Sequence, residues 1–547
     1  MNKCDSSDEA RVGLRRLRQQ SVLVALAMLA TLFLTSFNLP LTWDEGNGVI
    51  RSYPLVTWFE KLISGEPGVF SPETLAQHWQ FTNTVEGHPT LFAIVISAGY
   101  WISDGWLPAP VSYRFGPMVL FAVAAGAVFY RMAREYSMTV AIGTMVAICG
   151  IPRLFAHVHF ASHDSPLISC WMLAWASFGS ARMHWRGVFS FGFVLGMALS
   201  CKFTGWMVPL PFLVWALLYR DRRAVRALGI GMPVAFVVFL ALNPTLWHAP
   251  IEGMREFFRL NMNRGFNIPT QFFGEHYNLD HRLPWYNTIV WVCITVPVGL
   301  LGLLICGLWG IFRGTNSQRR SGVLLVGHWL ILLVVRATPF APPHDAVRLF
   351  VASFPFLAAI AGIGFGRLFK MPRSGGVGRR ESLSVKSATA LLLLGASVAN
   401  LGLYAPQWLS FYSCSIGGLR GATELGMEPT YFWDGLDGSV LDWLHQKTSP
   451  NAQVCFQEYP MENLRLMEAA GMLEFGYSID VEQPFEWYVI QHRPSKWNPV
   501  DRWLVENETP AYSKIISQKG WWAWKLDVPL IFVFSHRQFE AARLATR

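Results

Sequence analysis

Residues 21–45 read SVLVALAMLATLFLTSFNLPLTWDE, a largely apolar run that ends directly at two adjacent carboxylates, Asp44 and Glu45. About 20 apolar residues are what a helix needs to cross the roughly 30 Å hydrocarbon core of a bilayer. Four arginines lie between residues 11 and 18, and no small-residue cleavage site follows the run. The stretch therefore predicts a retained first membrane span. A charge beside the hydrocarbon boundary is costly unless it has a partner or a function, so the carboxylate pair is a candidate site.

The whole chain has the composition of a polytopic α-helical membrane protein. Of its 547 residues, 52% are hydrophobic and only 15% are charged, and the mean hydropathy is +0.30. A soluble globular protein averages about 25% charged residues. Twelve apolar segments lie at 21–40, 88–104, 111–131, 137–155, 165–181, 187–201, 204–219, 226–243, 286–312, 321–336, 347–366 and 387–405.

The basic residues indicate which side of the membrane each loop faces, because Lys and Arg in short loops favour the cytoplasm. If all twelve segments crossed, the basic loop 220–226 would lie opposite the N-terminal arginines. Segment 88–104 begins with His88-Pro89 and contains Asp104, so we expect it to lie along the outer interface as an amphipathic helix. The remaining eleven spans then place the basic clusters inside and the C-terminus outside.

Several function classes lack support in the sequence. The net charge of +9 (45 basic minus 36 acidic residues) comes from loops between apolar runs, not from a basic stripe, so nucleic-acid binding is not expected. The chain has no P-loop, dinucleotide fingerprint or HExxH motif in suitable context. It also has no hydrolase elbow. An ATP-driven transporter is therefore unsupported.

The composition changes near residue 406, where long apolar runs stop. Strand-like runs at 453–456, 487–490 and 529–534 alternate with helical stretches at 440–446 and 463–471. We predict a cytoplasmic tail (1–20), a transmembrane domain (21–405) and a small extracytoplasmic α/β domain (406–547). Cys414 and Cys455 both fall in this last part, and their pairing is left open.

Two acidic positions lie where spans meet the predicted outer face. Asp44-Glu45 follows the first span, and Asp164 opens a later one in His163-Asp164-Ser165-Pro166. Transfer of a phosphate-activated group needs a base for the acceptor's proton and positive charge on the departing phosphate. We expect Asp44 to be the base, with Glu45 in support and Asp164 as a second carboxylate facing it. A plain helix cap is the alternative for Asp44 and Asp164.

Basic residues on the same face complete the candidate site. Lys202 and Arg348 are predicted to bind phosphate, which Arg contacts in a bidentate manner. Lys202 snorkelling to the interface and Arg348 pairing with a carboxylate are the alternatives. His88 and His344 are the other expected substrate-binding residues.

A divalent metal is the one cofactor considered. His157 and His159 precede His163 and Asp164, and such side chains suit a metal, with His163 and Asp164 as the proposed ligands. The spacing matches no standard site.

Together these motifs resemble the GT-C glycosyltransferases, in particular family 39, which includes protein O-mannosyltransferases and bacterial lipid A aminoarabinose transferases. The resemblance rests on Asp44-Glu45 after the first span, His88-Pro89, His163-Asp164-Ser165-Pro166, Cys201-Lys202-Phe203-Thr204, Arg348-Leu349-Phe350 and, after the last span, Gly417-Gly418-Leu419-Arg420 with Tyr431-Phe432-Trp433-Asp434. Thr90 stands where the family often has a second proline, and Ser413-Cys414 replaces a usual Asn.

This resemblance implies a GT-C-like fold of about 11 transmembrane helices and a transferase in a bacterial inner membrane. Its donor would be a polyprenyl-phosphate sugar, and its acceptor a protein, lipid or glycan. A transporter or lipid flippase is the alternative function, and a non-catalytic membrane scaffold is the third.

Overall fold

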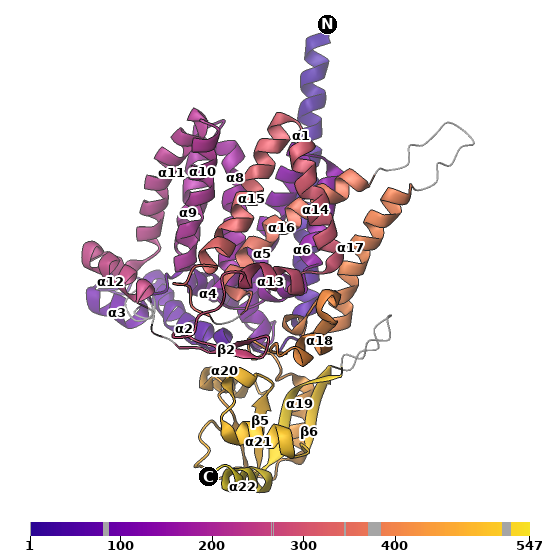
Figure 1. Cartoon of the computed structure of the whole chain (residues 1–547). Helices are drawn as coiled ribbons and strands as arrows, with labels where there is room; N and C mark the ends of the chain where they lie inside the picture. The colour runs from indigo at the N-terminus through magenta and orange to yellow at the C-terminus, as the bar shows by residue number, and fades with distance from the viewer. Residues whose placement is uncertain are drawn as a thin grey trace.

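The computed structural model describes residues 2–79, 87–263, 265, 267–343, 346–369, 384–516 and 527–547. Figure 1 shows a broad bundle of helices with a smaller α/β unit against one end of it. The N-terminal end of α1 (Asn2–Ser36) projects from the opposite end of the bundle (Figure 1). The chain is thus helical over most of its length, as the apolar segments predict.

The bundle and its connections contain the first seventeen α-helices. They are α1 (Asn2–Ser36), α2 (Trp43–Ser64), α3 (Pro72–Trp79), α4 (Leu91–Ser103), α5 (Ala109–Glu135), α6 (Met138–Cys149), α7 (Pro152–His157), α8 (Asp164–Ala181), α9 (Trp185–Leu199), α10 (Pro209–Leu218), α11 (Arg222–Ala241), α12 (Pro250–Met262), α13 (Asn287–Thr295), α14 (Val298–Arg313), α15 (Asn316–Arg336), α16 (Phe354–Leu368) and α17 (Val385–Tyr404). Short 3-10 helices are η1 (Phe203–Met207), η2 (Pro244–Leu246) and η3 (Arg348–Ser353), and a hairpin joins β1 (Thr270–Phe272) to β2 (Glu275–Tyr277).

Within the described residues, six helices are long and apolar enough to cross a membrane. They are Val12–Ser36, Ala109–Glu135, Arg222–Ala241, Asn316–Arg336, Arg348–Leu368 and Val385–Tyr404. A seventh arises if α13 and α14, which meet at 117°, form one broken span. The chain is therefore a multi-pass membrane protein.

All eleven segments predicted to cross are helical, but the number of spans stays a prediction. Helices α6 and α9 have 12 and 15 residues, and η1 with α10 forms another short apolar helix. At 1.5 Å per residue they are shorter than the roughly 30 Å core. Helix α4 has 13 residues and is apolar on both sides, since it exposes Trp101 and Ile102 while it buries Phe92 and Ile96. The amphipathic character predicted there is therefore not seen.

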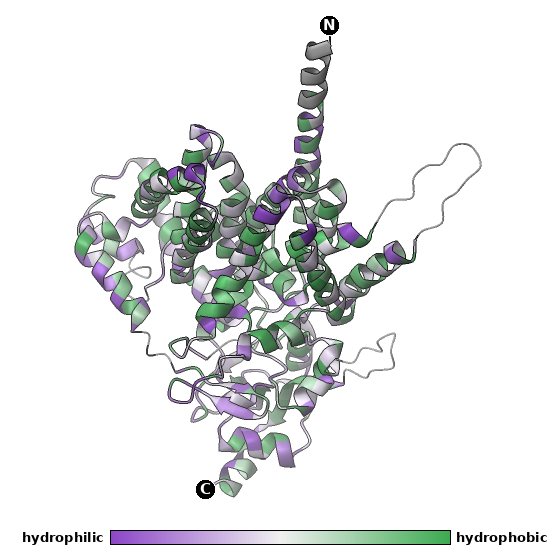
Figure 2. Cartoon of the chain, turned by 45° about the horizontal axis from the view of Figure 1, so that its top comes forward, coloured by the Kyte–Doolittle hydropathy of each residue, from purple (hydrophilic) through white to green (hydrophobic). Residues whose placement is uncertain are grey.

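Apolar side chains and close helix contacts hold the bundle together. Hydrophobic residues dominate the helices in Figure 2. Helices α14 and α16 approach so closely that a Cβ at Gly307 would overlap the carbonyl oxygen of Ile360, and one at Gly364 that of Leu303. Small residues at such crossings are typical of membrane helices, because they let two backbones come into contact.

The C-terminal unit is a five-stranded mixed sheet with helices. Its elements are α18 (Gly418–Glu424), α19 (Gly438–Lys447), β3 (Gln453–Phe456), α20 (Met461–Ala469), β4 (Gly476–Ser478), β5 (Trp487–Gln491), α21 (Pro499–Asn507), β6 (Tyr512–Ile516), β7 (Val528–Ser535) and α22 (His536–Ala545), with η4 (Trp408–Ser410), η5 (Cys414–Ile416) and η6 (Pro494–Lys496). The strand order is β4-β3-β5-β7-β6, with β3 parallel to β4 and β5, and β7 antiparallel to both its neighbours. The three predicted strands are confirmed as β3, β5 and β7, whereas the short β4 and the mixed-polarity β6 were not predicted.

Residues that follow the composition change at residue 406 pack with the bundle helices. Trp408, Tyr412 and Phe432 are buried in the core cluster that contains most of the bundle helices, whereas Trp433 and Leu436 belong to a cluster shared by α2, α4 and the sheet. Residues 406–432 therefore close the end of the bundle. The sequence does not reveal this because aromatic side chains fill the space without forming a long apolar run.

The structure separates the two cysteines whose pairing was left open. Cys455 is buried in β3 and Cys414 is exposed on η5, and both thiols are free. Cys414 lies instead beside the exposed, free Cys293 of α13. On either side of it, the Ser413 amide donates to the Ile294 carbonyl (2.7 Å) and the Ser415 hydroxyl donates to the Cys293 carbonyl (3.0 Å).

Oxidation of the purified protein with copper phenanthroline is expected to join Cys293 to Cys414. Both thiols are exposed on segments in hydrogen-bond contact, and a disulfide needs Cα atoms about 4.4–6.8 Å apart. Mass spectrometry of unreduced peptides would detect the link, and Cys293→Ser should abolish it. Recovery of both cysteines as free thiols under these conditions would contradict the packing of η5 on α13.

Candidate active site at the junction of the bundle and the C-terminal unit

The first turn of α2 carries Asp44 and is held from both sides. The Glu45 carboxylate reaches back to the Thr42 amide at 3.0 Å, as a Thr-x-x-Glu capping box predicts. From the C-terminal unit, the Asn463 side chain accepts from the Gly46 amide at 2.7 Å and donates to the Thr42 carbonyl at 2.9 Å. The carboxylate-bearing turn is therefore fixed by both parts of the molecule.

Asp44 belongs to a chain of four charged side chains. Arg348 bridges the two aspartates, since its Nη2 bonds to Asp44 Oδ2 and its Nε lies 2.9 Å from Asp164 Oδ2. Lys202 Nζ lies 2.8 Å from the other oxygen, Asp164 Oδ1. The order is Asp44–Arg348–Asp164–Lys202, so opposite charges alternate and sum to zero.

The four side chains come from four separate helix beginnings. Asp44 is in the first turn of α2, Asp164 opens α8, Lys202 directly precedes η1, and Arg348 opens η3. Helix N-termini favour negative charge, which suits the two aspartates. Asp44 has the most exposed side chain at 17%, against 4% for Asp164, 8% for Lys202 and 11% for Arg348. Asp44 is thus the carboxylate most open to an incoming group.

Glu45 faces away from this cluster although it is next to Asp44. Its carboxylate makes a bidentate pair with Arg114 (2.8 Å to both Nε and Nη2), and both side chains are 1% exposed. It also accepts from the Ala161 amide at 3.0 Å. Arg114 in turn donates to the carbonyls of Leu39 and Pro40. Glu45 is therefore a positioning residue that ties α2 to α5 and to the segment before α8.

Of the predicted histidines, His88 and His163 lie beside the cluster. Their ring centroids are 4.2 Å apart, and the His163 ring also packs on Phe92 at 3.7 Å. His344 lies outside the described residues. His88 therefore packs on the residue directly before Asp164, and its role in substrate binding stays a prediction.

The described side chains around Asp164 are arranged in ion pairs, and the divalent metal considered from the sequence stays a prediction. Both oxygens of Asp164 are bound by Lys202 and Arg348. His157 contacts the Tyr431 hydroxyl at 2.8 Å and His159 contacts the Thr35 hydroxyl at 2.9 Å, so the histidines diverge. Over the ranges that the structure describes, no three His, Cys, Asp or Glu side chains are grouped to hold a metal. Burial lowers the pKa of His157 to about 4, so it is neutral at pH 7.

The C-terminal segment 431–434 adds contacts that the sequence did not reveal. The Arg348 guanidinium stacks on the Phe432 ring at 4.4 Å, and the Phe432 carbonyl accepts from the Trp43 amide at 3.1 Å. Trp433, at a φ of +58°, packs on Trp43 with centroids 4.1 Å apart. The Tyr-Phe-Trp-Asp motif was the available signal, but it does not identify Arg348 as its partner.

Asp434 ends this segment as a fully buried acid beside a buried base. In the described part of the chain, the two carboxylate oxygens of Asp434 have no hydrogen-bond partner. The two terminal nitrogens of Arg153 have none either. The Arg153 guanidinium lies over the Tyr412 and Tyr431 rings at 4.5 and 4.9 Å. Burial raises the pKa of Asp434 to about 7, and the charge of Arg153 partly opposes that rise.

Asp434→Asn is expected to stabilise the protein relative to wild type, and more at pH 8 than at pH 5. The folded-state pKa of about 7 exceeds the ordinary value of 3.8. Between these two pH values the folded protein therefore binds more protons than the unfolded protein. Wild-type stability contributed by this group is therefore present at low pH and lost as the pH rises towards 7. Thermal unfolding in detergent at both pH values measures it, with the exposed Asp442→Asn as control. An equal difference in stability between Asp434→Asn and wild type at both pH values would show that the pKa of Asp434 is not raised in the folded protein.

The sequence of the central helices carries a family signature. Residues 88–248 match the family described as dolichyl-phosphate-mannose-protein mannosyltransferase. The family resemblance predicted from the motifs is confirmed over these residues. The matched segment supplies His88, Asp164 and Lys202, whereas Asp44 and Arg348 lie outside it on either side. It lends no support to the transporter alternative. A search of curated proteins found no match.

Several solved structures match the chain at low sequence identity. ArnT from Cupriavidus metallidurans in the apo state is 14% identical, with 94% of this chain and 98% of that chain covered and a TM-score of 0.49. The same protein bound to undecaprenyl phosphate gives 14% identity, the same coverage and a TM-score of 0.48. The oligosaccharyltransferase AglB from Archaeoglobus fulgidus, in complex with an inhibitory peptide and a dolichol-phosphate, is 12% identical, with 87% and 69% covered and a TM-score of 0.48. Similarity at this level transfers no substrate to the present chain.

Proposed function

We propose that this membrane glycosyltransferase moves a sugar from a polyprenyl-phosphate donor to an acceptor hydroxyl or amine at the end of the bundle covered by the C-terminal unit. The observation that carries the proposal is the chain Asp44–Arg348–Asp164–Lys202, which pairs a partly exposed carboxylate with Arg348 and links it through Asp164 to a second cation, Lys202. The matching family is named for a polyprenyl-phosphate sugar, which supports the donor class.

In the proposed reaction, the acceptor atom attacks the anomeric carbon of the sugar while the bond from that carbon to the phosphate oxygen breaks. The polyprenyl phosphate leaves with the bonding electrons, and the acceptor's proton passes to Asp44. Lys202 and Arg348 neutralise the negative charge that develops on the leaving phosphate. Both oxygens of Asp164 hold these cations, so Asp164 acts as a positioning residue.

The bridge through Arg348 links donor binding to the state of the base. Arg348 is shared between two carboxylates, and a guanidinium has a fixed set of donors. A donor phosphate that takes over the Nη2 contact releases Asp44 to accept a proton. Asp44 would therefore act as a base only when the donor is in place.

Incubation with a panel of polyprenyl-phosphate sugars, followed by mass spectrometry, tests the function. We expect one donor to be consumed, with free polyprenyl phosphate and a glycosylated product in equal amounts. Movement of an intact donor between bilayer leaflets without cleavage would indicate a flippase. No consumption of any donor by folded protein in the presence of protein, lipid and glycan acceptors would overturn the proposal.

We also propose that the site faces the extracytoplasmic side of a bacterial inner membrane. The support is the distribution of Lys and Arg, which favours the cytoplasm for the basic loops at the other ends of the spans. A reporter fused after Arg547 should score as extracytoplasmic. A cytoplasmic score would reject the eleven-span topology.

A further inference from the structure

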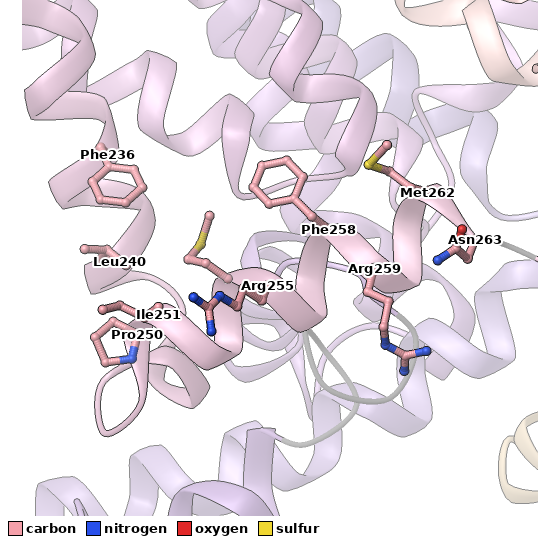
Figure 3. A pocket seen from close by; sticks show the side chains of 10 residues that line it. Phe236, Leu240, Pro250, Ile251, Arg255, Phe258, Arg259, Met262 and Asn263 are labelled. Atoms are coloured by element: carbon pink, nitrogen blue, oxygen red, sulfur yellow. The ribbon is translucent and has the colours of Figure 1, made fainter.

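A lipid-facing groove lies between α11 and α12, separate from the charged cluster. Its volume is about 750 Å³, within the range of sites that hold a small-molecule ligand. Figure 3 shows Phe236 and Leu240 of α11 facing the side chains of α12 across the groove. Met254 and Phe258 of α12 line it as well, so its wall is almost entirely apolar.

The two helices place this groove where the hydrocarbon meets the interface. Helix α11 is one of the six candidate spans and leaves Phe236 and Val237 41% and 64% exposed. Helix α12 follows it after a short turn, is strongly amphipathic, and leaves Ile251 and Met262 63% and 75% exposed. Such a helix lies in the interface with its apolar side in the acyl region. The groove therefore opens towards lipid.

Arg255 gives the groove a charged rim. Arg255 and Arg259 both line it, whereas Glu252 and Glu256 do not. Arg259 is neutralised by a bidentate pair with Glu256 at 2.6 and 2.7 Å and points away from α11 (Figure 3). Arg255 lies on the side facing α11, and no described carboxylate pairs with it. An unpaired guanidinium beside an apolar groove is complementary to a phosphate that carries a hydrocarbon chain.

We propose that this groove binds an anionic glycerophospholipid of the membrane. The acyl chain lies along Phe236, Leu240 and Phe258, and the headgroup phosphate accepts hydrogen bonds from Arg255. This places a lipid phosphate at the depth of an interfacial arginine, which is where phosphates lie in a bilayer. The bound lipid fills the space that separates α12 from the span before it.

The contacts of α12 suggest what the lipid does. The Phe258 ring packs on Phe203, the neighbour of Lys202, at 6.1 Å. The Asn261 side chain donates to the Gly87 carbonyl, one residue before His88, at 2.6 Å. A lipid that fixes α12 thereby steadies two segments that border the charged cluster. This effect rests on the proposed function, whereas the binding itself does not.

Binding is tested on the full-length protein in detergent with palmitoyl-oleoyl phosphatidylglycerol and with phosphatidylcholine of the same chains. Native mass spectrometry counts lipid adducts, and thermal unfolding reports stabilisation. We expect phosphatidylglycerol to bind at least fivefold more tightly and to raise the unfolding temperature. Arg255→Gln should remove this preference, and the equally exposed Arg537→Gln on α22 should retain it. Because Arg255 is exposed, its replacement leaves the fold intact.

Leu240→Trp provides a second variant that fills the groove and keeps the arginine. It should lose the adduct while the unfolding temperature without lipid is maintained. Equal binding of both lipids, or full preference in Arg255→Gln, would overturn the proposal. Displacement of phosphatidylglycerol from the wild-type protein by equimolar polyprenyl phosphate would show instead that the groove holds the donor's chain. Failure of the transfer assay leaves these binding results unaffected, so the two proposals fail separately.

Discussion

Replacing Asp44 with Asn is expected to lower the rate of sugar transfer by about 10²–10⁴-fold, the usual contribution of a positioned general base. The amide has nearly the same shape but cannot take a proton from the acceptor. Its loss also removes one of the two carboxylates, Asp44 and Asp164, that pair with Arg348. The measurement is initial rate of polyprenyl phosphate release at saturating donor, together with the unfolding temperature, which should stay close to the wild-type value because Asp44 is partly exposed.

The matched control is Asp280→Asn, an exposed carboxylate in the turn that follows β2. Its rate should equal that of wild type. Arg348→Lys adds a second comparison, because lysine keeps the charge but cannot bridge two carboxylates. Asp44→Asn with an undiminished rate would remove Asp44 from the chemistry and leave its pairing with Arg348 as a purely structural contact.

The second large effect concerns stability and falls on the neighbouring residue. Glu45→Gln is expected to destabilise the fold by about 3–5 kcal/mol, the usual cost of breaking a buried ion pair. The variant leaves the Arg114 guanidinium buried with a neutral amide in place of its carboxylate, and weakens the contact to the Ala161 amide. Chemical or thermal unfolding in detergent would show the loss, and the transfer rate per folded molecule should change little.

An exposed ion pair provides the control for this measurement. Arg420 and Glu424 are paired at 2.8 Å on α18 with side chains 57% and 63% exposed. Glu424→Gln should leave the unfolding transition where it is, because solvent screens such pairs. If Glu45→Gln unfolded at the wild-type temperature but lost transfer activity, Glu45 would be a member of the chemistry, as the sequence first suggested.

Much of the architecture could be predicted from the chain alone. The apolar segments are helices because a run of about 20 apolar residues has few other ways to satisfy its backbone in a membrane. The strands β3, β5 and β7 were predicted because their apolar runs are bounded by polar residues and turns. The packing of residues 408–432 on the bundle was not predicted, because Trp408, Tyr412 and Phe432 are scattered aromatic residues whose burial depends on distant helices.

Arg153 and Asp434 illustrate what sequence patterns miss. Arg153 lies in no recognisable motif, and the Tyr431-Phe432-Trp433-Asp434 motif gives no hint of a partner 281 positions earlier in the chain. Folding brings the base on α7 and the acid after Trp433 into one buried environment, where both lose contact with solvent. No local periodicity encodes that burial, so neither residue could be chosen as a candidate beforehand.

The sequence by itself determined that Asp44, Asp164, Lys202 and Arg348 lie at the ends of apolar segments, because charges are excluded from the hydrocarbon core. Hydropathy and basic-residue counts place such ends on one face. Only the tertiary structure decided that Asp44 reaches Arg348 while Glu45 reaches Arg114. Consecutive residues of an α-helix point about 100° apart, so two adjacent carboxylates meet different neighbours. Which neighbour stands on each side depends on how α5 and η3 pack around α2, and that arrangement separates the proposed base from its structural support.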